Sequence, residues 1–150
     1  MTMFFRRRSK DRHRSESGFT LVEILVVIAI IALIMSLVGP RVLNYLGESK
    51  VKAAKIQIQS FGSALDLYNL DVGRYPSTSE GLNALVKPPG MPGSWNGPYL
   101  KGGTVPNDPW GKAYTYRSPG EHGPYDILSY GSDGQEGGTG TAADIASWSR

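Results

Sequence analysis

An apolar run of twenty residues, Phe19 to Val38, constrains this chain more than any other feature of its sequence. Its polar members are Thr20, Glu23 and Ser36. Twenty residues of α-helix rise about 30 Å, which matches the hydrocarbon thickness of a bilayer. The run therefore predicts one helix across a membrane. Glu23 needs an explanation, because a carboxylate within a membrane span is costly and usually functional.

The basic residues are concentrated before this run. Residues 1–18 hold six Arg and Lys against two acids, a net charge of +4, so residues 19–150 carry −1 of the total of +3. A basic amino-terminal flank predicts that this end stays in the cytoplasm and that the rest crosses the membrane. Because the rest of the chain has no excess of basic residues, we expect no nucleic-acid partner.

Two alternatives to a functional span are a cleaved secretory signal and a plain membrane anchor. A secretory signal has an apolar stretch of about 7–15 residues and then a small-residue cleavage site. Here the stretch is longer, and Gly39-Pro40-Arg41 follows it. A plain anchor accounts for the length and the basic flank, but it gives Glu23 no role.

The start of the run carries a resemblance to a known class of proteins. The sequence Gly18-Phe19-Thr20-Leu21-Val22-Glu23, between a charged leader and an unbroken apolar helix, resembles the type III signal of type IV pilins and pseudopilins. The resemblance implies that a prepilin peptidase cleaves between Gly18 and Phe19 and methylates the new amino group of Phe19. It also implies that Glu23 pairs with the amino group of a neighbouring subunit in a filament. Opposite charges attract strongly away from water and relieve each other's desolvation.

A second helical pattern follows the apolar run. Six apolar residues on spacings of three and four predict one buried helix face: Ala54, Ile58, Phe61, Leu65, Tyr68 and Val72. We expect this face to pack on a globular body, and we expect the helix to end at Gly73, before Pro76. Pro40 predicts a kink or local unwinding at the membrane edge.

Residues 74–150 are rich in Gly and Pro, which predicts short elements joined by turns. Residues 81–86 favour a short helix. Residues 113–118 and 124–130 favour strands, joined by a hairpin loop at 119–123. The predicted fold class is α+β, with a long amino-terminal helix packed on a small antiparallel sheet.

The order of short motifs in the body makes the resemblance more specific. These motifs are Arg74-Tyr75-Pro76, Gly81-Leu82-Asn83-Ala84-Leu85, Asp108-Pro109-Trp110-Gly111, Ser118-Pro119-Gly120 and Ser129-Tyr130-Gly131-Ser132-Asp133-Gly134. From about Gly18 to Trp148, the chain is similar to the G-type pseudopilins of type II secretion, in the type IV pilin-like superfamily. This implies a major pseudopilin, the core subunit of a periplasmic pseudopilus that polymerises to drive folded exoproteins across the outer membrane. A subunit of another pilus-like filament, for adhesion, motility or DNA uptake, is the alternative.

The resemblance also implies processing, location and partners. Residues 1–18 are a cleaved leader, and residues 19–39 span the inner membrane once. Residues 40–73 continue the same helix into the periplasm, where residues 74–150 form the globular domain. The implied partners are further copies of the chain, minor pseudopilins, the prepilin peptidase and the inner-membrane assembly platform.

The loop from Gly131 to Asp144 is a candidate calcium site. Its many glycines are costly to order, and calcium binds mixed carboxylate and carbonyl oxygens. Asp133 and Asp144 lie near the two ends of the loop. From these residues alone, a calcium site and a solvated loop both stay open.

The resemblance favours calcium, because G-type pseudopilins bind calcium in this loop. It implies ligands from Asp133 and Asp144 and from backbone carbonyls around Tyr130 and Gln135. One position departs from some relatives, which have two adjacent acids where this chain has Ala143 before Asp144. Glu136 is a candidate substitute for the missing carboxylate.

No catalytic residue is expected. The two histidines, His13 and His122, have no nucleophile or metal ligand near them in sequence, and the chain has no Gly-rich phosphate loop. The absence of Cys excludes disulfides and thiolate chemistry. We therefore expect a structural protein rather than an enzyme. The cofactor implied by the resemblance is calcium.

Overall fold

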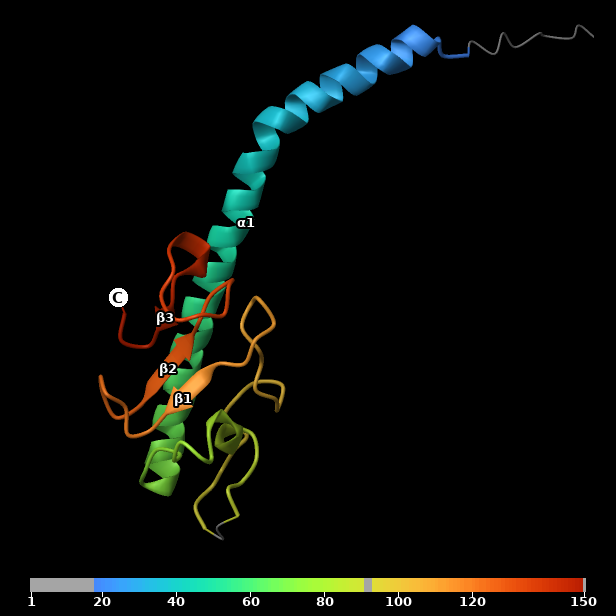
Figure 1. Ribbon diagram of the computed structural model, residues 1–150. Coiled ribbons are helices and arrows are strands. Elements are labelled where there is room, and N and C mark those ends of the chain that lie inside the picture. The colour runs from blue at the N-terminus through green and yellow to red at the C-terminus, as the bar shows by residue number, and fades with distance from the viewer. Residues whose placement is uncertain (1–17, 91–92, 150) are drawn as a thin grey trace, which may run out of the picture. The chain divides into compact units, whose positions relative to one another are not determined.

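The computed structural model describes residues 18–90 and 93–149 (Figure 1). Its elements in chain order are α1 (Leu21–Val72), the 3-10 helix η1 (Leu82–Leu85), β1 (Thr115–Arg117), β2 (Asp126–Ser129), the 3-10 helix η2 (Gly140–Ala142) and β3 (Ile145–Ala146). Two compact units are divided between Pro40 and Arg41. The predicted leader, apart from Gly18, lies outside the described residues.

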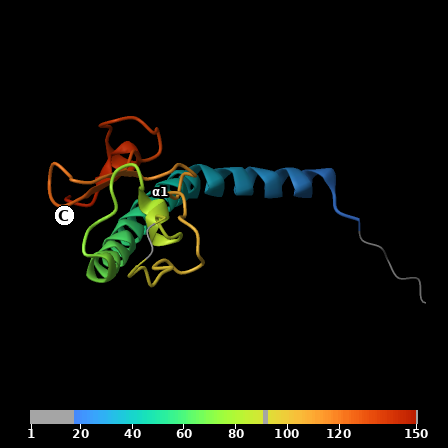
Figure 2. The same cartoon turned by 90° about the horizontal axis from the view of Figure 1, so that it is seen from below.

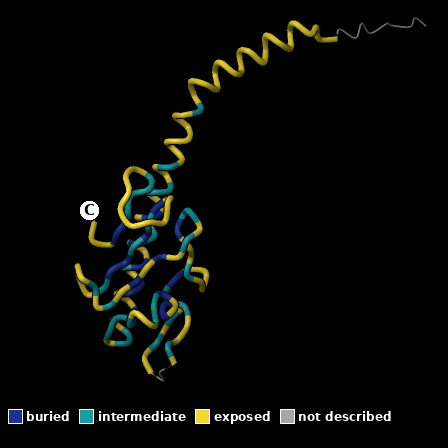
Figure 3. Tube along the Cα trace, viewed as in Figure 1, coloured by how far each residue is buried: buried dark blue, intermediate teal, exposed yellow. Residues whose placement is uncertain are grey.

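The first unit holds the apolar part of α1. This part is long and apolar enough to cross a membrane, and its most apolar 18-residue window has no buried residue. Figure 3 shows it as exposed along almost its whole length. Because no other described segment covers these side chains, lipid or another protein must do so.

The helix α1 runs without a break through Gly39 and Pro40. Of the two alternatives predicted at Pro40, a kink or local unwinding, the unwinding is absent. A proline removes one backbone N–H donor, but the residues on both sides keep their helical conformation here.

In the second unit, α1 packs against the body through the predicted face. Five of the six predicted residues are buried, and Val72 is half-buried. Phe61 meets Tyr114 edge to face, with ring centroids 5.0 Å apart, and Ile127 of the sheet is fully buried in the same core. Figures 1 and 2 together show the strands on one side of this part of α1. The predicted α+β arrangement is confirmed.

The sheet is antiparallel, with strand order β1-β2-β3. Tyr116 pairs with Ile127, and both side chains are buried, whereas Thr115 and Arg117 on either side of Tyr116 are exposed. The predicted hairpin is confirmed, with shorter strands than expected. The third strand was not predicted, because the two residues Ile145–Ala146 are too few for an alternating pattern.

A polar joint fixes the chain where α1 ends. Gly73 has φ 82° and donates its N–H to Asn69 O at 2.8 Å. Arg74 then makes two hydrogen bonds to the carboxylate of Glu80, both at 2.7 Å, and Ser77 N donates a third at 2.7 Å. The Arg74 guanidinium and then the Ser77 N–H lower the pKa of Glu80 to about 2.

Candidate functional site

The first turn of α1 holds Glu23 at the amino end of the helix. Thr20 precedes the helix, and its Oγ1 accepts a hydrogen bond from Glu23 N at 3.2 Å. Thr20 O accepts another from Ile24 N at 3.2 Å. Thr followed by Glu three residues later is the pattern of a capping box, and the helix dipole favours a carboxylate here. The prediction gave Glu23 only an assembly role and missed this pattern, although the sequence contains it.

The predicted processing site lies directly before this turn. Phe19 is 77% exposed, and Gly18 is also exposed. A Cβ built on Gly18 would meet nothing within 4 Å, and its backbone needs no positive φ. The fold of the described residues therefore does not require glycine at this position. Within residues 18–90 and 93–149, Glu23 forms no ion pair.

The carboxyl-terminal loop is closed by short-range hydrogen bonds. Gly134 N donates to Tyr130 O at 3.1 Å, and Ser132 N donates to Thr141 O at 3.0 Å. Gly131 has φ 61°, and a Cβ there would lie 2.8 Å from Ala143 O and 2.9 Å from Thr141 O. Only glycine allows the two ends of the loop to approach this closely.

Both predicted carboxylates hold the backbone of this loop. Asp133 Oδ1 accepts a hydrogen bond from Gln135 N at 3.1 Å, and Asp144 Oδ2 accepts one from Gly137 N at 2.9 Å. The second oxygen of Asp144, Oδ1, is buried and has no hydrogen-bond partner among the described residues. Burying a carboxylate oxygen without a hydrogen-bond donor costs folding free energy. A cation bound at Asp144 Oδ1 would offset this cost.

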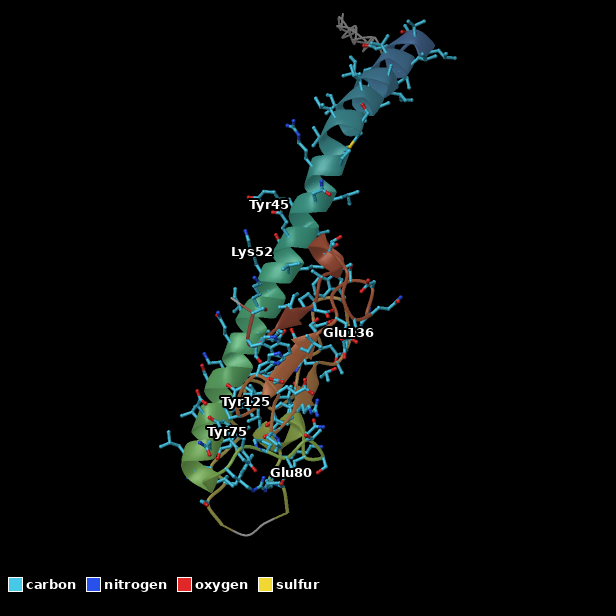
Figure 4. The ribbon with its side chains drawn as sticks, turned by 60° about the vertical axis from the view of Figure 1, so that its left-hand side comes forward. Tyr45, Lys52, Tyr75, Glu80, Tyr125 and Glu136 are labelled. Atoms are coloured by element: carbon cyan, nitrogen blue, oxygen red, sulfur yellow. The ribbon has the colours of Figure 1, made fainter. Side chains whose placement is uncertain are left out.

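The structure brings together only some of the predicted ligands. Tyr130 and Asp144 line a common hollow of about 550 Å³, and Glu136 lines it too. Figure 4 shows Glu136 on the carboxyl-terminal loop. Asp133 and Gln135 are linked to each other and are not among the residues that line this hollow. Among the described residues, no three His, Cys, Asp or Glu side chains gather as a metal site would require. A calcium ion here would therefore depend on backbone carbonyls as well as carboxylates.

The wall of the same hollow contains a contact that the sequence did not indicate. His122 stacks on Trp148, with ring centroids 4.0 Å apart and an interplanar angle of 4°, and its Nδ1 lies 3.2 Å from Asp126 Oδ2. Burial alone would raise the pKa of Asp126, but the N–H of Glu121 and the His122 ring together lower it. These contacts fix the carboxyl-terminal segment to the β1–β2 loop.

Two family models match this chain. The model described as "Type II secretion system (T2SS), protein G" matches residues 41–148, and the one described as "Prokaryotic N-terminal methylation motif" matches residues 13–39. Together they cover the first turn of α1, the span and the body. The chain belongs to the type II secretion system protein G family.

Relatives and a solved structure agree with this membership. The type II secretion system core protein G of Pseudomonas aeruginosa is 47% identical, covering 91% of this chain and 98% of that protein. Those of Vibrio cholerae and Escherichia coli K12 are 44% and 42% identical, covering 90% and 94% of this chain. The crystal structure of the major pseudopilin from enterohaemorrhagic Escherichia coli matches with a TM-score of 0.57 and 34% identity, over 71% of this chain and 92% of that one. The comparisons thus favour a secretion pseudopilin over the other filament subunits considered from the sequence.

Proposed function

We propose that this chain is the repeating subunit of a pseudopilus, a filament that assembles from the inner membrane and extends into the periplasm. In this proposal residues 1–18 are removed, residues 19–39 anchor the subunit in the membrane, and residues 40–150 stand in the periplasm. The observation that carries the proposal is the uncovered apolar first part of α1, which bears a carboxylate in its first turn. Such a helix needs lipid before assembly and the helices of other copies afterwards.

The surroundings of Gly18 support cleavage between Gly18 and Phe19. Among the residues that the structure describes, nothing requires glycine at position 18, so its presence is explained better by recognition by a peptidase. The adjacent peptide group lies outside α1, and Gly18 and Phe19 are both exposed. Cleavage there leaves a new ammonium group on Phe19, next to the first helical turn.

Glu23 is proposed to pair with this ammonium group on a neighbouring subunit. The capping pattern offers a second explanation for Glu23, in which the carboxylate only stabilises the end of the helix. The two explanations differ, because Gln also serves in a capping box but carries no charge. The substitution Glu23→Gln therefore removes the charge pair while it keeps the capping pattern.

The test is filament formation by the full chain in cells that carry the secretion apparatus. Glu23→Gln should insert into the membrane and be cleaved, but it should form no filaments and secrete no exoprotein. Thr20→Val is the matched control: it loses the cap, worth about 1 kcal/mol, keeps the charge, and should still assemble. Normal filaments from Glu23→Gln would contradict the charge-pair role, and equal loss in both variants would assign Glu23 to capping.

We also propose that the loop from Gly131 to Asp144 holds calcium. The residues fit this ion, because Asp144 Oδ1 is a buried oxygen without a donor and the loop contains further carboxylate and carbonyl oxygens. Asp144 and Glu136, which line one hollow with Tyr130, would supply charge, and the Tyr130 carbonyl would add a neutral oxygen. Asp133 and the Gln135 carbonyl lie outside this hollow, so binding would have to draw them in. The bound cation would neutralise these acids and hold the loop in one conformation.

Thermal unfolding of the full chain in detergent micelles, with calcium or with a chelator, tests this site. The wild type should melt at a higher temperature with calcium, and Asp144→Ala should lose that difference. Asp66→Asn, which changes an exposed acid on α1 whose side chain contacts Tyr75, is a control that should keep it. A wild-type melting temperature that is the same with calcium and with the chelator would contradict the proposed calcium site.

A further inference from the structure

Two aromatic residues hold the segment from Trp95 to Tyr99 against the rest of the body. Trp95 Nε1 donates a hydrogen bond to Ala84 O at 2.9 Å, and Tyr99 Oη donates one to Asp71 Oδ2 at 2.8 Å. The rings of Trp95 and Tyr99 also meet edge to face, with centroids 5.7 Å apart. Figure 1 shows the loop that contains this segment beside the carboxyl end of α1. Because the two rings touch, the chain between them must turn back on itself.

This turn has room only for glycine at position 97. A Cβ built on Gly97 would collide with the Trp95 ring, at 2.7 Å from its Cε2 atom, and the hydrogen bond from Trp95 Nε1 fixes that ring. The preceding residue, Asn96, is exposed, and its carboxamide makes no hydrogen bond to any residue that the structure describes. The fold therefore requires glycine directly after an accessible asparagine side chain.

An asparagine side chain can react with the backbone nitrogen of the residue that follows it. The nitrogen attacks Cγ, a new N–Cγ bond forms, the Cγ–Nδ2 bond breaks, and ammonia leaves with the proton of the attacking N–H. Water then opens the resulting five-membered ring at one of its two carbonyl carbons. One opening gives aspartate, and the other gives isoaspartate, whose main chain runs through the former side-chain carbon. A following glycine favours the attack, because no side chain obstructs its nitrogen.

The structure distinguishes Asn96 from the other asparagines of the chain, which are Asn44, Asn69, Asn83 and Asn107. The first two of these lie inside α1, where the helical hydrogen bonds hold the backbone. For the other two, the N–H of the following residue donates to a carbonyl, at 3.3 Å and 2.7 Å respectively. Within residues 18–90 and 93–149, in contrast, Gly97 N donates no hydrogen bond. The attacking nitrogen is therefore restrained at four asparagines and unrestrained at Asn96.

We propose that Asn96 is a modification site, at which the Gly97 nitrogen displaces ammonia and water reopens the ring as aspartate or isoaspartate. The reaction needs no enzyme, and solvent water is its only other reactant. The inference is independent of the proposed function, because it depends on this turn alone.

The product changes the contact between this turn and α1. Asn96 N donates to Tyr99 Oη at 2.9 Å, and the same hydroxyl donates to Asp71 Oδ2 at 2.8 Å. Isoaspartate lengthens the main chain by one carbon between positions 96 and 97, which displaces this N–H from its acceptor. It also adds a carboxylate one hydroxyl away from Asp71, and like charges repel. The modified turn should therefore be held less firmly to the end of α1.

Peptide mapping by mass spectrometry tests the modification on the full chain in detergent micelles. The protein is kept in mildly alkaline buffer made with heavy-oxygen water and is then digested. The peptide that contains Asn96 should lose its amide nitrogen and gain a heavy oxygen, in two forms of equal mass that separate by chromatography. Asn96→Gln is the matched control, because it keeps the carboxamide but its attack would need a larger ring, and it should show no conversion. An Asn96 that stays unchanged, or that converts no faster than Asn83 and Asn107, would overturn the proposal.

Urea unfolding of the same samples tests the consequence for the contact with α1. After incubation, the converted wild type should unfold at a lower urea concentration than the fresh protein. Asn96→Gln should unfold at the same concentration before and after incubation, which excludes other damage as the cause. A converted wild type with an unchanged midpoint would contradict the weakened contact at Tyr99.

Discussion

Replacing Glu80 by Gln should weaken the joint between α1 and the body in a manner that depends on pH. Glu80 accepts two hydrogen bonds from Arg74 and one from Ser77 N, so its charged form is favoured in the folded state. The pKa of Glu80 accordingly falls from 4.5 to about 2. Because the folded pKa is lowered, this stabilisation is fully present above the unfolded pKa near 4.5. It is lost as the pH falls toward the folded value of about 2.

The magnitude follows from this difference in pKa. At about 1.4 kcal/mol per pKa unit, the difference between 4.5 and about 2 corresponds to roughly 3 kcal/mol. Arg74 is 38% exposed, however, and solvent screens its charge. We therefore expect Glu80→Gln to cost about 1–2 kcal/mol at pH 7.

Urea unfolding of residues 41–150, the compact unit that contains the joint, gives the free energy of unfolding. The difference between the wild type and Glu80→Gln should be largest at pH 7 and should shrink steadily below pH 4.5. Glu121→Gln is the control, because its ion pair with Arg117 is exposed on both sides and should contribute under about 0.5 kcal/mol. A Glu80→Gln difference that does not change with pH would refute the reasoning.

Two further substitutions test the body. Gly131→Ala should destabilise it by more than Gly137→Ala does: both need a positive φ, worth about 1 kcal/mol, but only at Gly131 would the Cβ collide with backbone oxygens. Equal free energies of unfolding for the two variants would contradict the close approach in the loop. Tyr116→Phe removes a buried hydrogen bond of 2.8 Å to Pro76 O and should cost about 1–2 kcal/mol in urea unfolding. An unchanged free energy of unfolding for Tyr116→Phe would mean that water reaches the Pro76 carbonyl and replaces the lost hydrogen bond.

The features that could be predicted from the sequence are those that give a regular local spacing of apolar residues. The spacing from Ala54 to Tyr68 follows the helical repeat, and all of its apolar members are buried. The hairpin of β1 and β2 was predicted from alternation and turn residues. In contrast, β3 has two residues and exists because β2 offers it an edge. Nothing local to Ile145 indicates a strand.

The candidate site shows the same division. Thr20 and Glu23 form a capping pattern within four consecutive residues of the sequence, so it could have been recognised there. The buried oxygen of Asp144 could not have been, because its burial depends on how the loop folds over it. The pairing of His122 with Trp148 joins residues that are distant in the chain, and local patterns do not encode such contacts.

The most direct test of the account is the intact mass of the subunit recovered from purified filaments. The account predicts a chain that begins at Phe19, is shorter by eighteen residues and carries one added methyl group on its amino terminus. Only that chain has an ammonium group beside the first turn of α1, where the carboxylate of a neighbouring copy can meet it. A subunit in functional filaments that still begins at Met1 would contradict the account.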